Sequence, residues 1–167
     1  MAEITLKGQP IHTIGTLPQV GSKAPSFRLT AGDLTDKGLD AFAGKKKVLN
    51  IVPSLDTGVC ATSAMRFNEE VGKRPNTVLL NVSADLPFAQ SRFCESHSLR
   101  NIITLSTMRA PSFGGDYGVT IVDGPLAGLL SRAVLVLDER NHVIHAQQVP
   151  EITQEPDYAA ALSALGK

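Results

Sequence analysis

The clearest pattern in the chain is an apolar run at residues 48–52, which only Asn50 interrupts. A continuous run of this length is typical of a central strand that is covered on both faces. Pro53 predicts the end of the strand, because proline has no N–H to donate to a neighbouring strand. A second apolar run occupies residues 78–82. Between the two strands, one helix face is predicted by an apolar stripe at helical spacing: Cys60, Ala64, Phe67 and Val71.

This stripe directs Cys60 toward the protein body, in the first turn of a helix that we expect to end at Gly72. A strand, a helix and a second strand of these lengths form a βαβ unit, which implies parallel strands and a right-handed crossover. A further helix is predicted with Asp85 near its N-cap and Pro87 in its first turn. Its inner face would consist of Leu86, Ala89 and Phe93, which leaves Cys94 at the rim.

Shorter patterns predict the other elements. They are a hairpin at residues 4–6 and 11–14, strands at 27–30 and 102–105, a helical turn at 39–42, an irregular connection at 109–129, a strand pair at 133–137 and 142–149, and a final helix at 157–165. This element order is that of a thioredoxin-like α/β fold, a central mixed sheet flanked by helices, with an N-terminal β-hairpin extension. We expect a single domain over residues 1–167.

Composition and charge exclude several classes of function. Apolar residues make up 43% of the chain, and the 16 basic residues balance the 16 acidic ones, so neither a nucleic acid nor a membrane is expected as a partner. The one basic run, residues 45–47, is interpreted as a solvated turn. No apolar run is long enough to span a membrane. The N-terminus lacks the pattern of a signal peptide, so we expect a cytoplasmic location.

The chain has two cysteines, Cys60 and Cys94, and neither belongs to a CxxC motif or to a Cys/His pair with ligand spacing. We therefore expect no metal and no cofactor. A structural disulfide between them could contribute about 3–4 kcal/mol in the chain-entropy model. In a reducing compartment, a catalytic or transient disulfide is the favoured interpretation. The four histidines are scattered and suggest neither metal binding nor acid–base catalysis.

The surroundings of Cys60 favour reactivity over a purely structural role. On composition alone, a cysteine on an apolar helix face is a small core residue. A helix N-terminus, however, stabilises an anion through its free N–H groups and its dipole. Thr57 lies three residues earlier, where its hydroxyl can cap the helix or donate to an oxygen bound beside the sulfur. Pro53 would fix the loop and shield the thiol.

Two segments resemble known motifs. Residues 53–60, Pro-Ser-Leu-Asp-Thr-Gly-Val-Cys, resemble the Pro-x-x-x-Thr-x-x-Cys signature of the peroxiredoxins. Residues 83–94, Ser-Ala-Asp-Leu-Pro-Phe-Ala-Gln-Ser-Arg-Phe-Cys, resemble the resolving-cysteine helix of the bacterial thiol peroxidase subfamily, whose members are atypical 2-Cys peroxiredoxins. Further matches extend the resemblance to the last helix: residues 47–51, 123–126, 132–134 and 155–158.

The resemblance implies a role for each motif residue. Cys60 would be the peroxidatic cysteine, whose thiolate attacks a hydroperoxide and becomes a sulfenic acid. Thr57 would orient the peroxide, and Pro53 would shape the site. Arg132 would stabilise the thiolate and bind the peroxide, although without the resemblance it would be interpreted as a surface charge at a strand end. Cys94 would be the resolving cysteine, which forms an intramolecular disulfide with Cys60.

The same resemblance implies hydrogen peroxide and alkyl or lipid hydroperoxides as substrates, thioredoxin as the reductant, and a homodimer. A disulfide requires Cα atoms within about 7 Å, whereas thiols on separate packed helices are often farther apart. We therefore expect the first turn around Cys60 and part of the Cys94 helix to unwind during turnover. Two alternatives stay open: a thioredoxin-like peroxide sensor that relays its disulfide, and a cysteine hydrolase, for which no local histidine signature exists.

Overall fold

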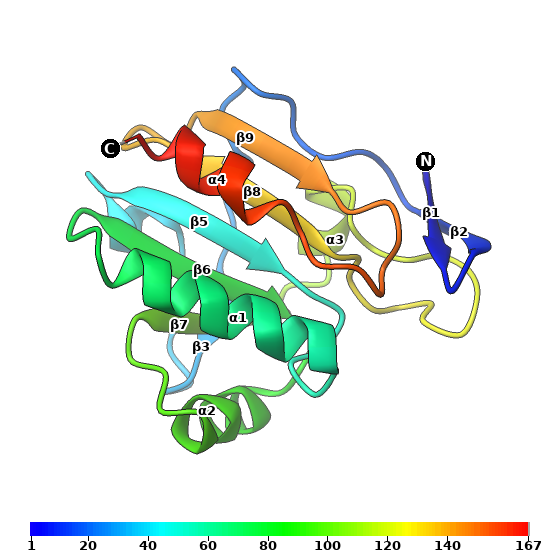
Figure 1. Ribbon diagram of the computed structural model, residues 1–167, viewed down its shortest axis with the longest axis horizontal. Helices are drawn as coiled ribbons and strands as arrows, with labels where there is room; N and C mark the ends of the chain where they lie inside the picture. Colours follow the sequence, from blue (N-terminus) through cyan, green and yellow to red (C-terminus); the bar gives the residue numbers. More distant parts are fainter. Residues whose placement is uncertain (167) are drawn as a thin grey trace.

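The computed structural model describes residues 1–166, which form a seven-stranded sheet with helices on both faces and a separate two-stranded hairpin (Figure 1). The strand order in the large sheet is β4-β3-β7-β6-β5-β8-β9. The elements in chain order are β1 (Ala2–Leu6), β2 (Gln9–Thr13), β3 (Leu29–Ala31), β4 (Asp36–Lys37), η1 (Leu39–Phe42), β5 (Lys46–Ile51), α1 (Gly58–Val71), β6 (Thr77–Ser83), α2 (Pro87–Ser96), β7 (Ile102–Ser106), α3 (Phe113–Asp116), β8 (Ala133–Leu137), β9 (Val143–Gln148) and α4 (Tyr158–Ala164).

The centre of the sheet confirms the predicted βαβ unit. Strands β5 and β6 are parallel, with Asn50 opposite Asn81, and α1 connects them and ends at the predicted Gly72. β7 adds a third parallel strand, whereas β8 and β3 are antiparallel to their neighbours β5 and β7. Since the parallel strands β5 and β6 end at the same edge of the sheet, the loops that follow them meet there.

Alternate residues of the central strands serve two different cores. One core lies under α1 and α4, where Phe67 packs edge-on against Tyr158 at a ring-centroid distance of 5.1 Å. The other core lies on the opposite face, where α3 contributes Phe113. Figure 1 shows α1 and α4 in front of the sheet and α3 behind it. The long apolar runs of β5 and β6 are thus explained, because both of their faces are covered.

The N-terminal hairpin docks at the edge of the sheet where β5 ends (Figure 1). Its two-residue turn consists of Lys7 and Gly8, both with positive φ, which is the geometry that a tight hairpin requires. Thr5 then exchanges backbone hydrogen bonds with the segment after β9: its N–H donates to Pro150 O at 2.8 Å and its carbonyl accepts from Ile152 N at 2.9 Å.

Four local predictions were wrong. Lys46 and Lys47 belong to β5 instead of a solvated turn, and the buried Lys47 donates from Nζ to Asn141 Oδ1 at 2.6 Å. Burial lowers the pKa of Lys47. The strand predicted at residues 27–30 begins at Leu29, and the connection at 109–129 contains the short helix α3. In α2 the buried face consists of Pro87, Gln90 and Phe93 instead of Leu86, Ala89 and Phe93.

Across residues 1–166, none of the helices has both the length and the apolar character that a membrane span needs.

Candidate active site

Cys60 lies in the first turn of α1 and is completely buried, as its place in the apolar stripe predicts. It packs in a small apolar cluster with Val52 and Leu55 before the helix, Ala64 one turn later, and Phe93 of α2. The chain reaches this position because β5 stops at Ile51 and the next residues turn back over the edge of the sheet. The thiol is therefore held between the sheet, α1 and α2.

Arg132 supplies a cation to this buried sulfur. It directly precedes β8, its side chain is only 3% exposed, and its Nη1 donates a hydrogen bond to Cys60 Sγ at 3.0 Å. A second hydrogen bond, from Nε to Ile152 O at 2.8 Å, fixes the guanidinium plane. A guanidinium beside the sulfur is the kind of surroundings in which reactive cysteines are found. The interpretation of Arg132 as a surface charge is wrong.

The start of α1 adds donors on the other side of the sulfur. Thr57 is the N-cap residue, but its hydroxyl does not cap the helix and instead donates to Ser54 O at 3.1 Å. No side chain caps the N–H groups of the first turn within residues 1–166. Gly58 and Val59, which carry two of these groups, line a cavity next to Cys60. The helix N-terminus thus offers backbone donors and a positive dipole end to a bound anion or oxygen.

This cavity has a volume of about 320 Å³ and is mostly apolar, and its lining includes Arg132 and Thr57. The hairpin contributes Leu6, and the segment after β9 contributes Ile152. No sequence pattern predicts this wall, because its residues come from distant segments that only the fold brings together. The cavity is lined by Leu6, Pro53, Ser54, Thr57, Gly58, Val59, Leu126, Leu129, Arg132, Ile152 and Thr153.

Buried polar side chains tie the first turn of α1 to the sheet. Ser63 Oγ donates to Cys60 O at 3.0 Å, and Asn50 Nδ2 donates to Ser63 Oγ at 3.3 Å. Asn50 Nδ2 also lies 2.9 Å from Asn81 Oδ1 on the neighbouring strand. The single polar interruption in the apolar run of β5 is thereby explained, because Asn50 positions the backbone that carries the thiol.

Glu151 holds two segments of the cavity wall together through hydrogen bonds. Its carboxylate accepts hydrogen bonds from the Thr5 hydroxyl, from Lys7 N at 2.7 Å and from Gly8 N at 3.2 Å. These hydrogen bonds, with that of Thr153, lower the pKa of Glu151 to about 2. The carboxylate therefore holds the hairpin turn against the segment that provides Ile152 O to Arg132.

Cys94 lies in the second half of α2 and is half-buried, as its predicted rim position suggests. It borders the apolar cluster that contains Cys60, yet both cysteines are free. Burial, and secondarily the negative charge of Glu95, raises the pKa of Cys94. The structure thus brings both thiols to one side of the sheet without joining them.

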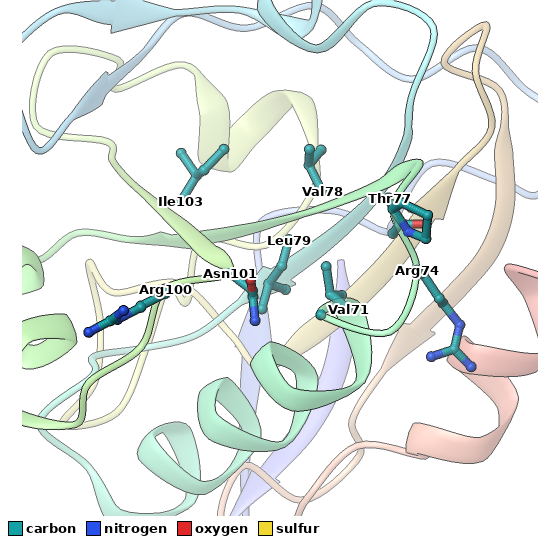
Figure 2. A pocket seen from close by; sticks show the side chains of 10 residues that line it. Val71, Arg74, Thr77, Val78, Leu79, Arg100, Asn101 and Ile103 are labelled. Atoms are coloured by element: carbon teal, nitrogen blue, oxygen red, sulfur yellow. The ribbon is translucent and has the colours of Figure 1, made fainter.

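A different cavity, of about 270 Å³, lies at the far end of α1 around Val71 (Figure 2). It contains no cysteine, and its two arginines, Arg74 and Arg100, point in different directions in Figure 2. Arg74 is also paired with Glu70 at 3.3 Å. Because these charges do not converge, this cavity lacks the geometry of an anion site, and the candidate active site remains the cavity beside Cys60.

The comparisons with known proteins agree with this geometry. The family model named Redoxin matches residues 19–162. The thiol peroxidase of Mycobacterium bovis is 55% identical over 166 residues, which cover 99% of each chain. This chain belongs to the redoxin family, in its thiol peroxidase group.

Two solved structures of family members have the same fold as this chain. A peroxiredoxin-like protein from Aquifex aeolicus aligns with a TM-score of 0.92 at 38% identity, covering 99% of this chain and 96% of that one. A thiol peroxidase from Chromobacterium violaceum aligns with a TM-score of 0.90 at 27% identity, covering 98% and 94%. The predicted thioredoxin-like fold and the predicted peroxiredoxin class are confirmed.

Proposed function

We propose that this thiol peroxidase reduces hydroperoxides at Cys60, with Cys94 as the resolving cysteine and thioredoxin as the reductant. The observation that carries the proposal is the hydrogen bond from the buried Arg132 to Cys60 Sγ, at 3.0 Å, beside an apolar cavity. A buried cysteine with only a structural role would not need a desolvated cation, because burying an arginine is costly unless its charge is compensated. A thiolate provides that compensation.

In the first step, the Cys60 thiolate attacks one oxygen of R–O–O–H. The O–O bond breaks and an S–O bond forms, so that sulfur loses two electrons and the peroxide gains them. The leaving alkoxide takes up a proton from solvent and departs as ROH. The Thr57 hydroxyl, now directed at Ser54 O, would turn to the peroxide, while Arg132 and the first-turn amides stabilise the charge that develops on the leaving oxygen.

In the second step, the Cys94 thiolate attacks the sulfenic sulfur of Cys60. An S–S bond forms, and the hydroxide that leaves is protonated to water. Both cysteines are buried or half-buried on different helices, so the first turn of α1 and part of α2 must open for this attack. The dithiol of thioredoxin would then reduce the disulfide, which returns two electrons and two protons to the cysteines.

The cavity wall suggests which hydroperoxides bind. Leu6, Leu126, Leu129 and Ile152 offer apolar contacts to a substituent on the peroxide, while Arg132 joins the lining to Cys60 Sγ. This arrangement favours alkyl and lipid hydroperoxides over hydrogen peroxide, because an apolar substituent gains from leaving water. We place the reaction in the cytoplasm, and we propose that the active species is a homodimer.

Peroxide-dependent consumption of NADPH with thioredoxin and thioredoxin reductase tests this proposal. We expect repeated turnover, with higher kcat/KM for an alkyl hydroperoxide than for hydrogen peroxide, and no turnover for Cys60→Ser. Oxidation of one equivalent without further turnover would instead indicate a peroxide sensor. Hydrolysis of an acyl substrate that depends on Cys60 would indicate a cysteine hydrolase.

A further inference from the structure

Asp85 makes hydrogen bonds that its predicted position near the N-cap of α2 does not explain. Its Oδ1 accepts from Ser54 Oγ at 2.7 Å, and its Oδ2 accepts from Leu55 N at 2.8 Å and from Ser83 Oγ at 2.8 Å. Leu86, not Asp85, is the N-cap of α2. The half-buried carboxylate therefore joins two loops that lie about 30 residues apart in the sequence. We call the set Ser54, Leu55, Ser83 and Asp85 the Asp85 junction.

The two sides of the Asp85 junction lead to the two cysteines. On one side, Ser54 and Leu55 belong to the loop before Cys60, and Ser54 O is the acceptor for the Thr57 hydroxyl. On the other side, Asp85 directly precedes α2, which carries Cys94. Gln90 of α2 strengthens this side, because its buried Nε2 donates to Ser83 Oγ at 3.0 Å.

At the start of α2, Pro87 is buried but its two neighbours are exposed, so these polar contacts supply much of the attachment. Leu86 is 55% exposed and Phe88 is 67% exposed. The rear half of α1 differs, because Phe67 and Val71 are buried in the core under α4. Hydrogen bonds can be exchanged for water at small net cost, whereas exposing a core face is expensive. The segments on either side of the Asp85 junction are therefore those that can open while the rest of the sheet stays folded.

We propose that Asp85 is a positioning residue that holds the Cys60 loop and the start of α2 in the peroxide-reactive arrangement. Release of its hydrogen bonds frees both segments together, and this release precedes the attack of Cys94 on Cys60. The inference rests on the proposed Cys60–Cys94 disulfide. Asp85 touches neither sulfur in this arrangement, and it acts by setting how often the closed form opens.

Asp85→Asn tests this role, because the amide keeps the size of the side chain but loses acceptor capacity and charge. Asp56→Asn is the matched control, since Asp56 is exposed in the same loop and its carboxylate accepts no hydrogen bond within residues 1–166. The chain has no tryptophan, so both chemical steps are followed by rapid quenching and mass spectrometry. Hydrogen exchange of the reduced protein reports opening directly.

We expect Asp85→Asn to form the disulfide about tenfold faster than wild type after sulfenic acid formation, since weakening charge-assisted hydrogen bonds raises the open population. Its sulfinic acid yield at high peroxide falls accordingly, because resolution competes better with overoxidation. Hydrogen exchange should speed up together at residues 54–57 and 86–90 but not at residues 64–71. Asp56→Asn should behave as wild type. Ser54→Ala, which removes one donor, should accelerate the disulfide step about threefold.

Three results would overturn the inference: equal disulfide rates for Asp85→Asn and Asp56→Asn, a slower disulfide step in Asp85→Asn, or faster exchange on only one side of the Asp85 junction. A loss of overall stability alone would speed exchange at residues 64–71 as well, which also contradicts it. If Asp85→Asn does not fold, the disulfide rate and the hydrogen exchange of Ser54→Ala test the inference in its place. Failure of the proposed function is a separate outcome, because wild-type protein would then form no Cys60–Cys94 disulfide at all.

Discussion

The two cysteines lie on the same side of the sheet but in opposite chemical environments. Cys60 is fully buried in the first turn of a 14-residue helix. Its Sγ lies 3.0 Å from Nη1 of the Arg132 guanidinium. Cys94 is half-buried late in α2, where burial and the neighbouring Glu95 raise its pKa. The two positions thus differ in that only Cys60 is buried in contact with a cation.

This difference sets an order of events. Under the proposed function, Cys60 would react with a peroxide in the apolar cavity, whereas the raised pKa of Cys94 keeps its sulfur a neutral thiol while the site is closed. Opening of α2 removes the burial that suppresses Cys94, so its thiolate would form when Cys60 has become accessible to it. Under the proposed function, the same movement would bring the thiols together and activate the second one.

The largest expected effect comes from Arg132→Lys, which retains a charge but cannot make hydrogen bonds to Cys60 Sγ and Ile152 O at once. We expect the rate of Cys60 oxidation by peroxide to fall about 100-fold, as for the loss of one donor to a developing charge. Rapid quenching and mass spectrometry of the Cys94→Ser variant measure the oxidation of Cys60 alone, because no resolving thiol is present. Arg140→Lys, an exposed arginine of the β8–β9 turn, is the control. Equal loss in both variants would contradict the assigned role of Arg132.

A smaller effect is expected from pH on the second step. Because the pKa of Cys94 is raised, the thiol is neutral at pH 7, and its thiolate fraction increases with pH. The rate of disulfide formation should rise about tenfold per pH unit until the pKa of Cys94 is reached. Glu95→Gln removes the nearby negative charge and should speed this step about threefold at neutral pH. A disulfide step independent of pH would show that thiolate formation at Cys94 is not limiting.

The smallest effect is expected from Glu151→Gln, which weakens the contact between the hairpin turn and the cavity wall. KM for a bulky alkyl hydroperoxide should rise about threefold with little change for hydrogen peroxide, since only the large substrate uses the wall. Glu139→Gln, on an exposed turn, is the control. Because the pKa of Glu151 is depressed to about 2, the wild-type contact contributes stability above the ordinary value of 4.5 and loses it as pH falls toward 2. Equal changes in KM for both peroxides would contradict this assignment.

Local sequence patterns predicted the parts of the fold that depend on periodicity. The apolar run of β5, the stripe from Cys60 to Val71 and the stop at Gly72 correspond closely to the structure. Patterns failed in α2, where helical phase was assigned from Leu86 and Ala89, both exposed. The buried face there includes Gln90, a polar residue whose burial depends on hydrogen bonds to Ser83 and to the carbonyl of Leu105.

Some residues of the candidate site could likewise be predicted from a local pattern, and others could not. Cys60, Thr57 and Pro53 are close in sequence, so a short motif could identify them. Arg132 could be assigned only through the family resemblance, because its burial results from the packing of β8 beside β5. Neither the cavity wall nor the contacts of Asp85 had a sequence signal. They require segments that meet only after the hairpin docks and the two parallel strands end at one edge.

A thiol count shows whether Cys60 and Cys94 act in sequence as nucleophile and resolving thiol. Reduced wild type, Cys60→Ser and Cys94→Ser are titrated before and after one equivalent of hydroperoxide. We expect wild type to lose both thiols to one intramolecular disulfide, Cys94→Ser to lose its single thiol to sulfenic acid, and Cys60→Ser to keep its thiol. Unchanged thiols in wild type, or oxidation of Cys94 in Cys60→Ser at the wild-type rate, would contradict the account.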